Sequence, residues 1–244
     1  MLTKNQIKYI KDLSRKSKRA ENQKFVVEGE KLIEEMIQSR IEFEEIFALD
    51  SWNCPVNDVP VTRVSQKELE RITQLKTPNK VLAVVYMFED EVSDDQENGI
   101  TLFLDRINDP GNLGTIIRMA DWFGINKIIC TENSVDVYNP KVIQSSMGSV
   151  FRIPVFYQNA TEYLSQYKMQ FPNNPIFGAA MEGEVLGKLE MPLNGLLIMG
   201  SESHGIDPEI ERFISQFITI PNFGQAESLN VAVATGIVLW EWKR

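Results

Sequence analysis

Residues 100–124 read ITLFLDRINDPGNLGTIIRMADWFG, and this segment carries the clearest signal of fold class. The continuous apolar run at 100–104 predicts a buried strand. Residues 109–112 predict a turn, and the apolar spacing after it predicts a helix over 113–123, which Gly124 ends. An apolar strand without polar alternation, joined to a helix, is typical of a parallel sheet that is covered on both faces.

The same alternation continues to the end of the chain. It predicts further strands at 127–130, 153–157, 175–180, 195–199 and 217–220, and helices at 140–147, 161–169, 208–214 and 228–242. Residues 98–244 are therefore expected to form one α/β domain built on a parallel sheet.

A shorter region of mixed elements precedes this domain. It contains predicted helices at 4–19, 28–38 and 65–75, and predicted strands at 25–27, 43–49, 61–64 and 81–87. Ser65 and Glu68 have the spacing of a capping box, which opens the third helix. Residues 89–97, of which six are acidic, are expected to separate the two regions, so that 1–90 forms a small α/β domain of its own.

Positive charge is concentrated at the N-terminus. The 244-residue chain has a net charge of −9, but residues 1–24 carry +6, which leaves −15 for the remainder. The basic residues expected to meet the phosphates of a nucleic acid are Lys4, Lys8, Lys11, Arg15, Lys16, Lys18 and Arg19. A solvated helix face explains the same charges equally well.

Composition excludes several classes of protein. The chain is 43% hydrophobic and 24% charged, which is typical of a folded globular protein. Two cysteines, Cys54 and Cys130, exclude a disulfide framework and favour a reducing compartment. A single histidine and the lack of Cys-x-x-Cys spacing predict that the chain has no metal site. Neither a secretory signal nor a membrane-spanning run is visible, so a cytoplasmic location is expected.

Polar residues follow the strand at 100–104. Asn112 lies in the predicted turn, and Arg118 stands one to two turns into the helix, whose free N–H groups can receive an anion. In open parallel sheets, ligands bind at the carboxyl ends of strands. On these residues alone, a tight turn followed by a surface arginine is the simpler interpretation.

Two later strand ends have a similar character. The strand at 195–199 runs into Gly200 and Glu202, and glycine there lets the backbone approach a ligand closely. His204 has no visible partner and is taken as incidental. Ser228 and Asn230 begin the last helix, where capping explains their presence. Asn230, however, is expected to enter a helix of valine and alanine, and an amide buried there needs hydrogen-bond partners.

The three segments together are far more specific than any one of them. Asn-x-Gly…Arg at 112–118, Gly-x-Glu-x-x-Gly at 200–205 and Ile-Pro…Ser-Leu-Asn at 220–230 resemble the three signature motifs of the SpoU/TrmH family of RNA 2'-O-ribose methyltransferases. The resemblance covers residues 98–244 closely. It extends to the longer members, which carry an N-terminal substrate-binding domain of L30e-like type, here 1–90.

This resemblance implies a fold and a cofactor. The fold is the knotted, trefoil parallel-sheet domain of the SPOUT superfamily, an exception to the rule that chains are not knotted. The cofactor is S-adenosylmethionine, which has no pyrophosphate and so needs no glycine-rich phosphate fingerprint. Carried over by position, the residues implied to bind or neighbour it are Ala179, Ala180, Gly200, Ile220, Ser228 and Leu229.

The resemblance also implies roles in methyl transfer to a ribose 2'-oxygen. Arg118 is the implied catalytic residue. Because a guanidinium is a poor base, we expect it to clamp a phosphate and orient the ribose, with a role as base left open. Asn112 is expected to support Arg118, and Glu202 to organise its loop. Ser228 and Asn230 are expected to hold cofactor and backbone together.

Partners follow from the same resemblance. A homodimer is expected, with the site completed across the interface and the last helix, through Leu239, Trp240 and Trp242, supplying contacts. The N-terminal domain favours ribosomal RNA over transfer RNA as substrate. The alternatives are a non-catalytic RNA-binding or ribosome-assembly protein, a knotted relative that methylates a base, and a Rossmann dehydrogenase, which the missing glycine fingerprint disfavours.

Overall fold

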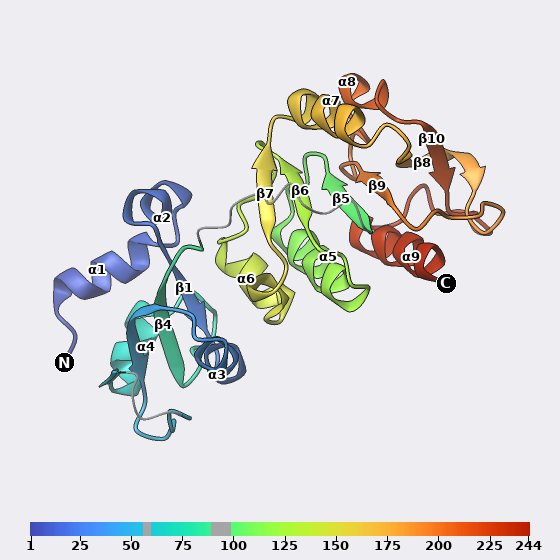
Figure 1. Cartoon of the computed structure of the whole chain (residues 1–244). Helices are drawn as coiled ribbons and strands as arrows, with labels where there is room; N and C mark the ends of the chain where they lie inside the picture. Colours follow the sequence, from blue (N-terminus) through green and yellow to red (C-terminus); the bar gives the residue numbers. More distant parts are fainter. Residues whose placement is uncertain (56–59, 89–98) are drawn as a thin grey trace. The chain divides into compact units, whose positions relative to one another are not determined.

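The computed structural model describes residues 1–55, 60–88 and 99–244 (Figure 1). The chain divides into two compact units, Met1–Glu89 with Tyr138–Gly148, and Asp90–Val137 with Ser149–Arg244. The expected acidic separator at 89–97 lies outside the described residues.

The second unit is built on one six-stranded sheet in which every neighbouring pair of strands is parallel. This confirms the predicted α/β class. The strand order is β10-β8-β9-β5-β6-β7. The strands are β5 (Ile100–Leu104), β6 (Ile128–Thr131), β7 (Val155–Gln158), β8 (Ile176–Val185), β9 (Gly195–Met199) and β10 (Gln216–Thr219).

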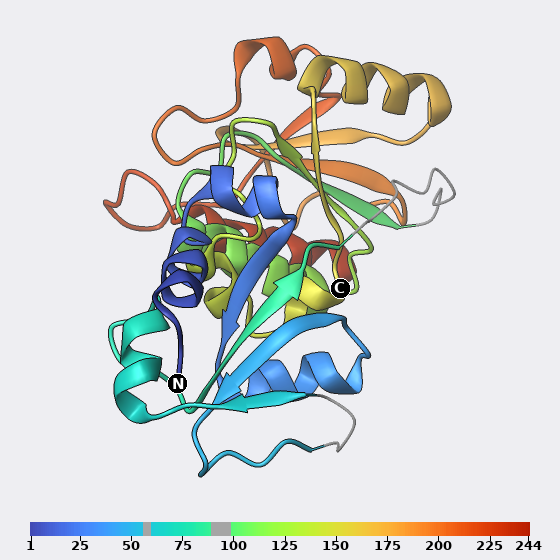
Figure 2. The ribbon, with the colours of Figure 1, turned by 90° about the vertical axis from the view of Figure 1, so that its left-hand side faces the viewer.

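Helices cover both faces of this sheet. Figures 1 and 2 show α5 and α9 on one face and α7 and α8 on the other. The helical segments are α5 (Pro110–Trp122), α7 (Ala160–Gln170), α8 (Pro208–Glu211), α9 (Val231–Lys243) and a single 3-10 turn, η1 (Ser149–Phe151). Within the described part of the chain, no helix combines the length and the apolar composition needed to cross a bilayer.

The sheet has a switch point between β5 and β9. Ile100 pairs with Gly195, and the register continues to Leu104 opposite Met199. Because the two strands are parallel neighbours, the segments that follow Leu104 and Met199 emerge side by side. This is the place at which open α/β sheets bind ligands.

The first unit contains a smaller, mixed sheet of order β1-β4-β2-β3, in which only β2 and β3 pair in parallel. Ser65 and Glu68 form the predicted capping box. The strands are β1 (Lys24–Glu28), β2 (Phe43–Ala48), β3 (Val61–Arg63) and β4 (Val81–Tyr86), and the helices are α1 (Lys4–Asp12), α2 (Lys16–Asn22), α3 (Glu30–Gln38), α4 (Gln66–Ile72) and α6 (Pro140–Ser146).

Helix α6 packs within the first unit, although it lies inside the range predicted for the second domain, 98–244. The amide of Gln144 donates to the carbonyl of Glu28 at 2.6 Å. The ring of Tyr138 lies 4.8 Å from that of Phe25. These contacts join residues more than a hundred positions apart, which local sequence pattern does not reveal.

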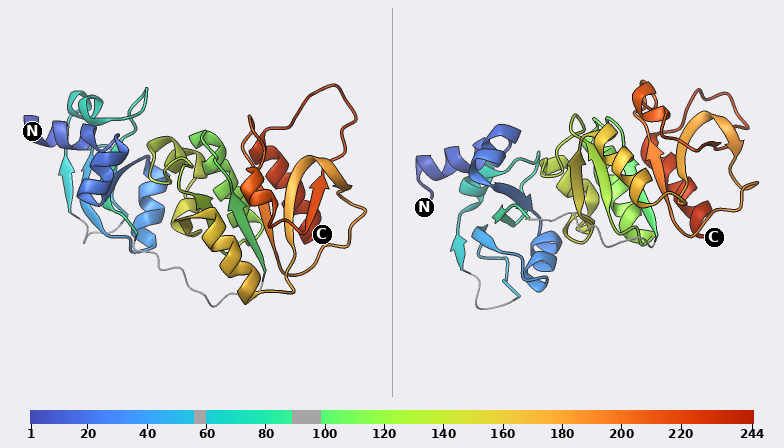
Figure 3. Two further views of the ribbon diagram at one scale, coloured as in Figure 1. Left: turned by 90° about the horizontal axis from the view of Figure 1, so that it is seen from above. Right: turned by 45° about the horizontal axis from the view of Figure 1, so that its top comes forward.

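The predicted single helix at 4–19 is wrong, because the chain turns between α1 and α2 (Figures 1 and 3). The hydroxyl of Ser14 donates to the carbonyl of Lys11 at 2.8 Å and so competes with the helical pattern. Arg15 is extended, with ψ at 130°.

Two helix starts in the second unit also differ from expectation. Helix α5 begins at Pro110, with Asp109 as its N-cap, so residues expected to form a turn are its first helical turn. Helix α9 begins at Val231 rather than at 228, because the side chain of Asn230 caps it.

Helix α9 was expected to supply contacts to a second copy through Leu239, Trp240 and Trp242. Leu239 and Trp242 are buried, and the indole N–H of Trp242 donates to the carbonyl of Pro192 at 2.6 Å. Trp240 is 61% exposed. Of the three residues expected to meet a second copy, only Trp240 is therefore accessible in the chain.

Candidate active site

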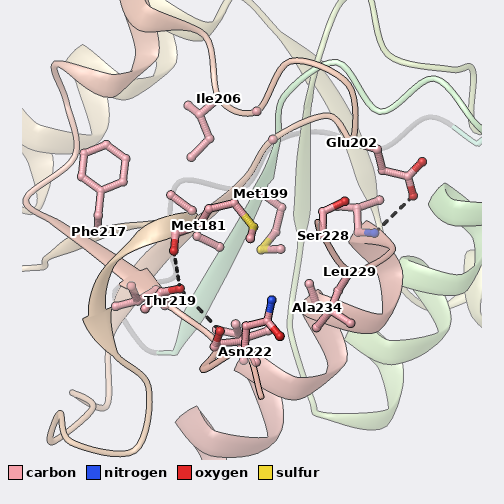
Figure 4. Close-up of a pocket in the computed structure, with 18 of the residues that line it drawn as sticks. Met181, Met199, Glu202, Ile206, Phe217, Thr219, Asn222, Ser228, Leu229 and Ala234 are labelled. Atoms are coloured by element: carbon pink, nitrogen blue, oxygen red, sulfur yellow. Dashed lines mark hydrogen bonds between the residues drawn. The ribbon is translucent and has the colours of Figure 1, made fainter. Parts of the chain in front are cut away.

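A cavity of about 490 Å³ opens at the carboxyl ends of β9 and β10 and beside the middle of β8. Figure 4 shows Glu202 and Ser228 on one side of it and Phe217 and Thr219 on the other. Its lining includes all six residues expected to bind or neighbour the cofactor: Ala179, Ala180, Gly200, Ile220, Ser228 and Leu229.

A break in the sheet makes room for this cavity. Strand β10 pairs Phe217 with Gly178 of β8, and the next residue, Ile218, pairs with Glu184. Residues 179–183 of β8 therefore have no paired residue on β10, and the first three of them line the cavity. The hydroxyl of Thr219 donates to the carbonyl of Met181 at 2.9 Å and holds the edge of the opening (Figure 4).

The loop after β9 approaches itself too closely for any side chain at position 200. A Cβ on Gly200 would lie 2.3 Å from the carbonyl carbon of Gly205. Ser201 and Gly205 exchange backbone hydrogen bonds of 3.0 and 2.9 Å, which close the loop. Glycine at 200 thus brings backbone, rather than side chain, to the wall of the cavity.

Three of the expected functional residues meet in one polar cluster. The amide groups of Asn112 and Asn230 donate to Oε1 of Glu202 at 2.9 and 2.6 Å. The amide of Asn230 also donates to Oδ1 of Asn112 at 2.9 Å, and the N–H of Val231 donates to Glu202 at 3.2 Å. A carboxylate that accepts several donors fixes their relative positions. The cluster joins α5, the β9 loop and the start of α9.

Asn230 has two functions at once. Its Oδ1 accepts from the N–H groups of Ala232 and Val233 at 3.1 and 3.3 Å, as an N-cap does. Its Nδ2 belongs to the polar cluster. The expectation of an amide buried inside a helix is wrong, because Asn230 is exposed and precedes the helix.

Arg118 lies apart from the cavity. It is exposed on α5 and is absent from the residues that line the cavity. Among the described residues it makes no hydrogen bond or ion pair, and Asn112, expected to support it, contacts Glu202 and Asn230 instead. A single chain thus presents the cavity and the guanidinium at different places.

Asp105 links the end of β5 to the segment that follows the β9 loop. Its carboxylate, almost fully buried, accepts from the N–H of Asp207 at 2.8 Å and pairs with Arg106 at 3.2 Å. Burial raises the pKa of Asp105 above its ordinary value, while the Asp207 N–H and the Arg106 guanidinium oppose that rise. Arg106 in turn reaches Asp207 at 3.0 Å.

The basic residues of the N-terminus divide into two groups. Lys4, Lys8 and Lys11 are exposed on α1, and Arg15 and Lys16 are exposed after it. These five side chains are accessible to a partner. Of the five, Arg15 also pairs with Asp12 at 3.6 Å.

The other two of the seven expected RNA contacts, Lys18 and Arg19, are less exposed. Lys18 pairs with Glu21. The prediction that Arg19 contacts RNA is wrong, because its side chain is only 2% exposed. Its guanidinium donates to the carbonyls of Leu13 and Ser14 at 3.0 and 2.7 Å. It closes the end of α1, a use of arginine that charge counting cannot distinguish from a surface role.

Several residues that line the cavity were not predicted from the sequence to be functional. Met181 and Thr219 lie beside the shift in register between β8 and β10, and Met199 is the last residue of β9. Asn222 and Phe223 lie in the loop that follows β10. His204, which was expected to be incidental, also lines the cavity. The Pro-Asn-Phe-Gly run at 221–224 is a turn signal that could have drawn attention to that loop.

Comparison with known proteins agrees with this geometry. The model of the SpoU rRNA Methylase family matches residues 99–240. The model of the MRM3-like substrate binding domain matches residues 4–83. The first match spans the unit that holds the cavity together with residues 138–148 of the other unit, and the second match falls within the smaller unit.

Individual relatives cover nearly the whole chain. The 23S rRNA (guanosine(2553)-2'-O)-methyltransferase RlmP of Bacillus subtilis is 32% identical over 242 residues, 97% of this chain and 96% of the relative. A TrmH-family protein of Porphyromonas gingivalis, described as a candidate RNA methyltransferase, has a solved structure with a TM-score of 0.87 and 35% identity, covering 99% of this chain and 98% of its own. An AdoMet-bound rRNA methyltransferase from Sinorhizobium meliloti has a TM-score of 0.85 and 28% identity, covering 100% and 95%.

Proposed function

The chain belongs to the SpoU rRNA methylase family, and we propose that it transfers the methyl group of S-adenosylmethionine to a ribose 2'-hydroxyl of ribosomal RNA. The observation that carries this proposal is the cavity at the ends of β9 and β10 and beside the middle of β8, joined to the Asn112–Glu202–Asn230 cluster. The names of the relatives support ribosomal RNA as the substrate class.

The residues of the cavity suit S-adenosylmethionine. A volume of about 490 Å³ is that of a small-molecule pocket. Ala179, Met199 and Leu229 offer apolar contact for an adenosine and for the carbon chain of the methionine part, whereas Ser228 and Asn222 offer polar contacts. Gly200 and Gly205 also line the cavity, and without side chains they can offer a ligand only backbone groups.

The bound cofactor supplies an electrophilic methyl group on a sulfonium. The chain must place the ribose 2'-oxygen in line with that group and help remove its proton. We assign orientation to Arg118, whose guanidinium binds a phosphate of the RNA in a planar fork. Its pKa is too high for it to act easily as a base. Glu202 holds the amides of Asn112 and Asn230, and so keeps the two loops beside the cavity in position.

We propose that the functional unit is a homodimer in which Arg118 of one protomer completes the cavity of its partner. Two features support this: the separation of Arg118 from the cavity of its own chain, and an exposed apolar stripe on α9. The stripe consists of Val233, Ile237 and Trp240, which are 47%, 37% and 61% exposed. Their spacing places them on one face of the helix.

Light scattering should therefore give twice the chain mass. Ile237→Asp should raise the dimer dissociation constant by about 100-fold or more, because a charge replaces an apolar contact in both protomers, and activity should fall with it. Met169→Asp, which alters an equally apolar but distant exposed position, serves as the control. A wild-type monomer with full activity would contradict the proposal.

We propose that Lys4, Lys8 and Lys11 of α1 attract the RNA backbone. Replacing all three by alanine should weaken RNA binding and reduce the slope of log K against log salt by about 0.7 to 0.9 for each phosphate that is no longer neutralised. Replacing Lys168, Lys188 and Lys243 removes the same charge from the other unit and should change the slope little. Equal effects of the two triple variants would mean that the lysines of α1 act only through net charge.

We also propose the family's trefoil knot for the C-terminal part of the chain and a cytoplasmic location. The return of the segment before α9 to Asn112 and Glu202 supports a threaded path. The two cysteines are free, Cys130 fully buried, which supports a reducing compartment.

The alternative function is a non-catalytic RNA-binding or ribosome-assembly protein on the same scaffold. A calorimetric titration with S-adenosylmethionine separates the two. We expect saturable binding at one site per chain, which Leu229→Asp in the cavity wall abolishes. No binding by the wild-type protein would favour the alternative.

A further inference from the structure

Phe223 combines two properties that rarely occur together. It lines the cavity, yet its side chain is 96% exposed. An aromatic ring at this level of exposure gains almost nothing from packing against its own chain. Its position beside the cavity therefore suits contact with a second molecule.

The exposure of Phe223 is built into a defined turn. Oδ1 of Asn222 accepts from the N–H of Gly224 at 2.8 Å, and Nδ2 of Asn222 donates to the carbonyl of Ala226 at 2.9 Å. Both ends of one amide thus brace the residues on either side of Phe223. The side chain of Asn222 therefore defines the backbone from which the exposed ring of Phe223 projects.

We propose that Phe223 stacks against a nucleobase of the RNA substrate at the mouth of the cavity. This inference rests on the proposed function. The reacting ribose must enter the mouth to reach the methyl group, so its own base, or that of the adjoining nucleotide, stays within reach of the surrounding loop. Bases splayed out of RNA are commonly held by stacking on aromatic side chains.

The composition of the loop favours a base over a second protein chain. Residues 221–230 are all exposed, and the neighbours of Phe223 include Asn222, Gln225 and Glu227. The centre of a protein interface is depleted in charge, whereas a lone aromatic side chain among polar residues is typical of a stacking platform. The apolar stripe of α9 is the better candidate for contact between protomers.

The test compares Phe223→Ala, Phe223→Leu and Phe223→Trp with the wild-type enzyme. Methyl transfer is measured on ribosomal RNA from cells that lack this protein, with calorimetry for S-adenosylmethionine and light scattering for mass. Leucine retains apolar volume without an aromatic face, and tryptophan retains the face. Leu193→Ala, which removes another 91% exposed apolar side chain, is the matched control.

We expect Phe223→Ala and Phe223→Leu to lower kcat/KM for RNA by about 5- to 100-fold, mainly through KM, and Phe223→Trp to retain most of it. Affinity for S-adenosylmethionine and the mass should stay at the wild-type values. Unchanged kcat/KM in the alanine variant, full activity with leucine, a matching loss of cofactor affinity or a change in mass would each overturn the inference. A wild-type protein that transfers no methyl group would overturn the proposed function, and this inference with it.

Discussion

Replacing Arg118 by alanine should lower kcat for methyl transfer by about 100- to 1000-fold, the range typical when a single preorganised charge-stabilising group is lost. Affinity for S-adenosylmethionine should stay within about twofold. The reason is geometric: Arg118 is exposed on α5, outside the lining of the cavity of its own chain, so its loss leaves the residues that form that lining in place.

Two variants sharpen this result. Arg118→Lys keeps the charge but loses the planar fork, and we expect it to recover little activity if bidentate phosphate contact is required. Arg244→Ala removes an exposed arginine of the same unit and should be neutral. In a mixed dimer of Arg118→Ala with Leu229→Asp protomers, one cavity should regain activity, since an intact arginine then faces an intact cavity. Wild-type turnover by Arg118→Ala would contradict its assignment.

Replacing Gly200 by alanine should weaken S-adenosylmethionine binding by about 10- to 100-fold and lower the melting temperature by several degrees. The new Cβ would lie 2.3, 2.4 and 2.5 Å from the carbonyl carbon and oxygen of Gly205 and the nitrogen of Ile206. These are backbone atoms, which cannot move without opening the loop that walls the cavity.

Gly224→Ala is the matched control for this effect. The nearest atom to a Cβ there is Oδ1 of Asn222 at 3.9 Å, an ordinary contact. Calorimetry and thermal unfolding of the two variants should differ clearly. If both bound the cofactor as the wild-type protein does, the backbone of the Gly200 loop would not form the cofactor wall.

The parallel sheet was predictable because its strands are continuous apolar runs. The strands at 100–104 and 195–199 were placed to the residue, since both faces of each are buried and no polar alternation blurs their ends. Adjacent carboxyl ends then follow from the general behaviour of such sheets. Strand ends drew attention to Asn112 and Glu202, but it was the resemblance to the SpoU/TrmH motifs that assigned functions to them and to Asn230.

Other features depend on contacts that sequence pattern does not contain. The cavity exists because β8 and β10 change register, which brings Met181 and Thr219 to its edge. Arg19 has the same local pattern as its basic neighbours, yet it is buried against the end of α1. Helix starts at Pro110 and Val231 were missed because side-chain caps, rather than periodicity, set them.

The most direct measurement is transfer of labelled methyl from S-adenosylmethionine to ribosomal and transfer RNA fractions of cells that lack this protein, followed by nucleoside analysis. We predict a labelled 2'-O-methylnucleoside in the ribosomal fraction, absent when Arg118→Ala replaces the wild-type protein. A label on a base, or no label from a chain that binds S-adenosylmethionine, would contradict ribose methylation by this site.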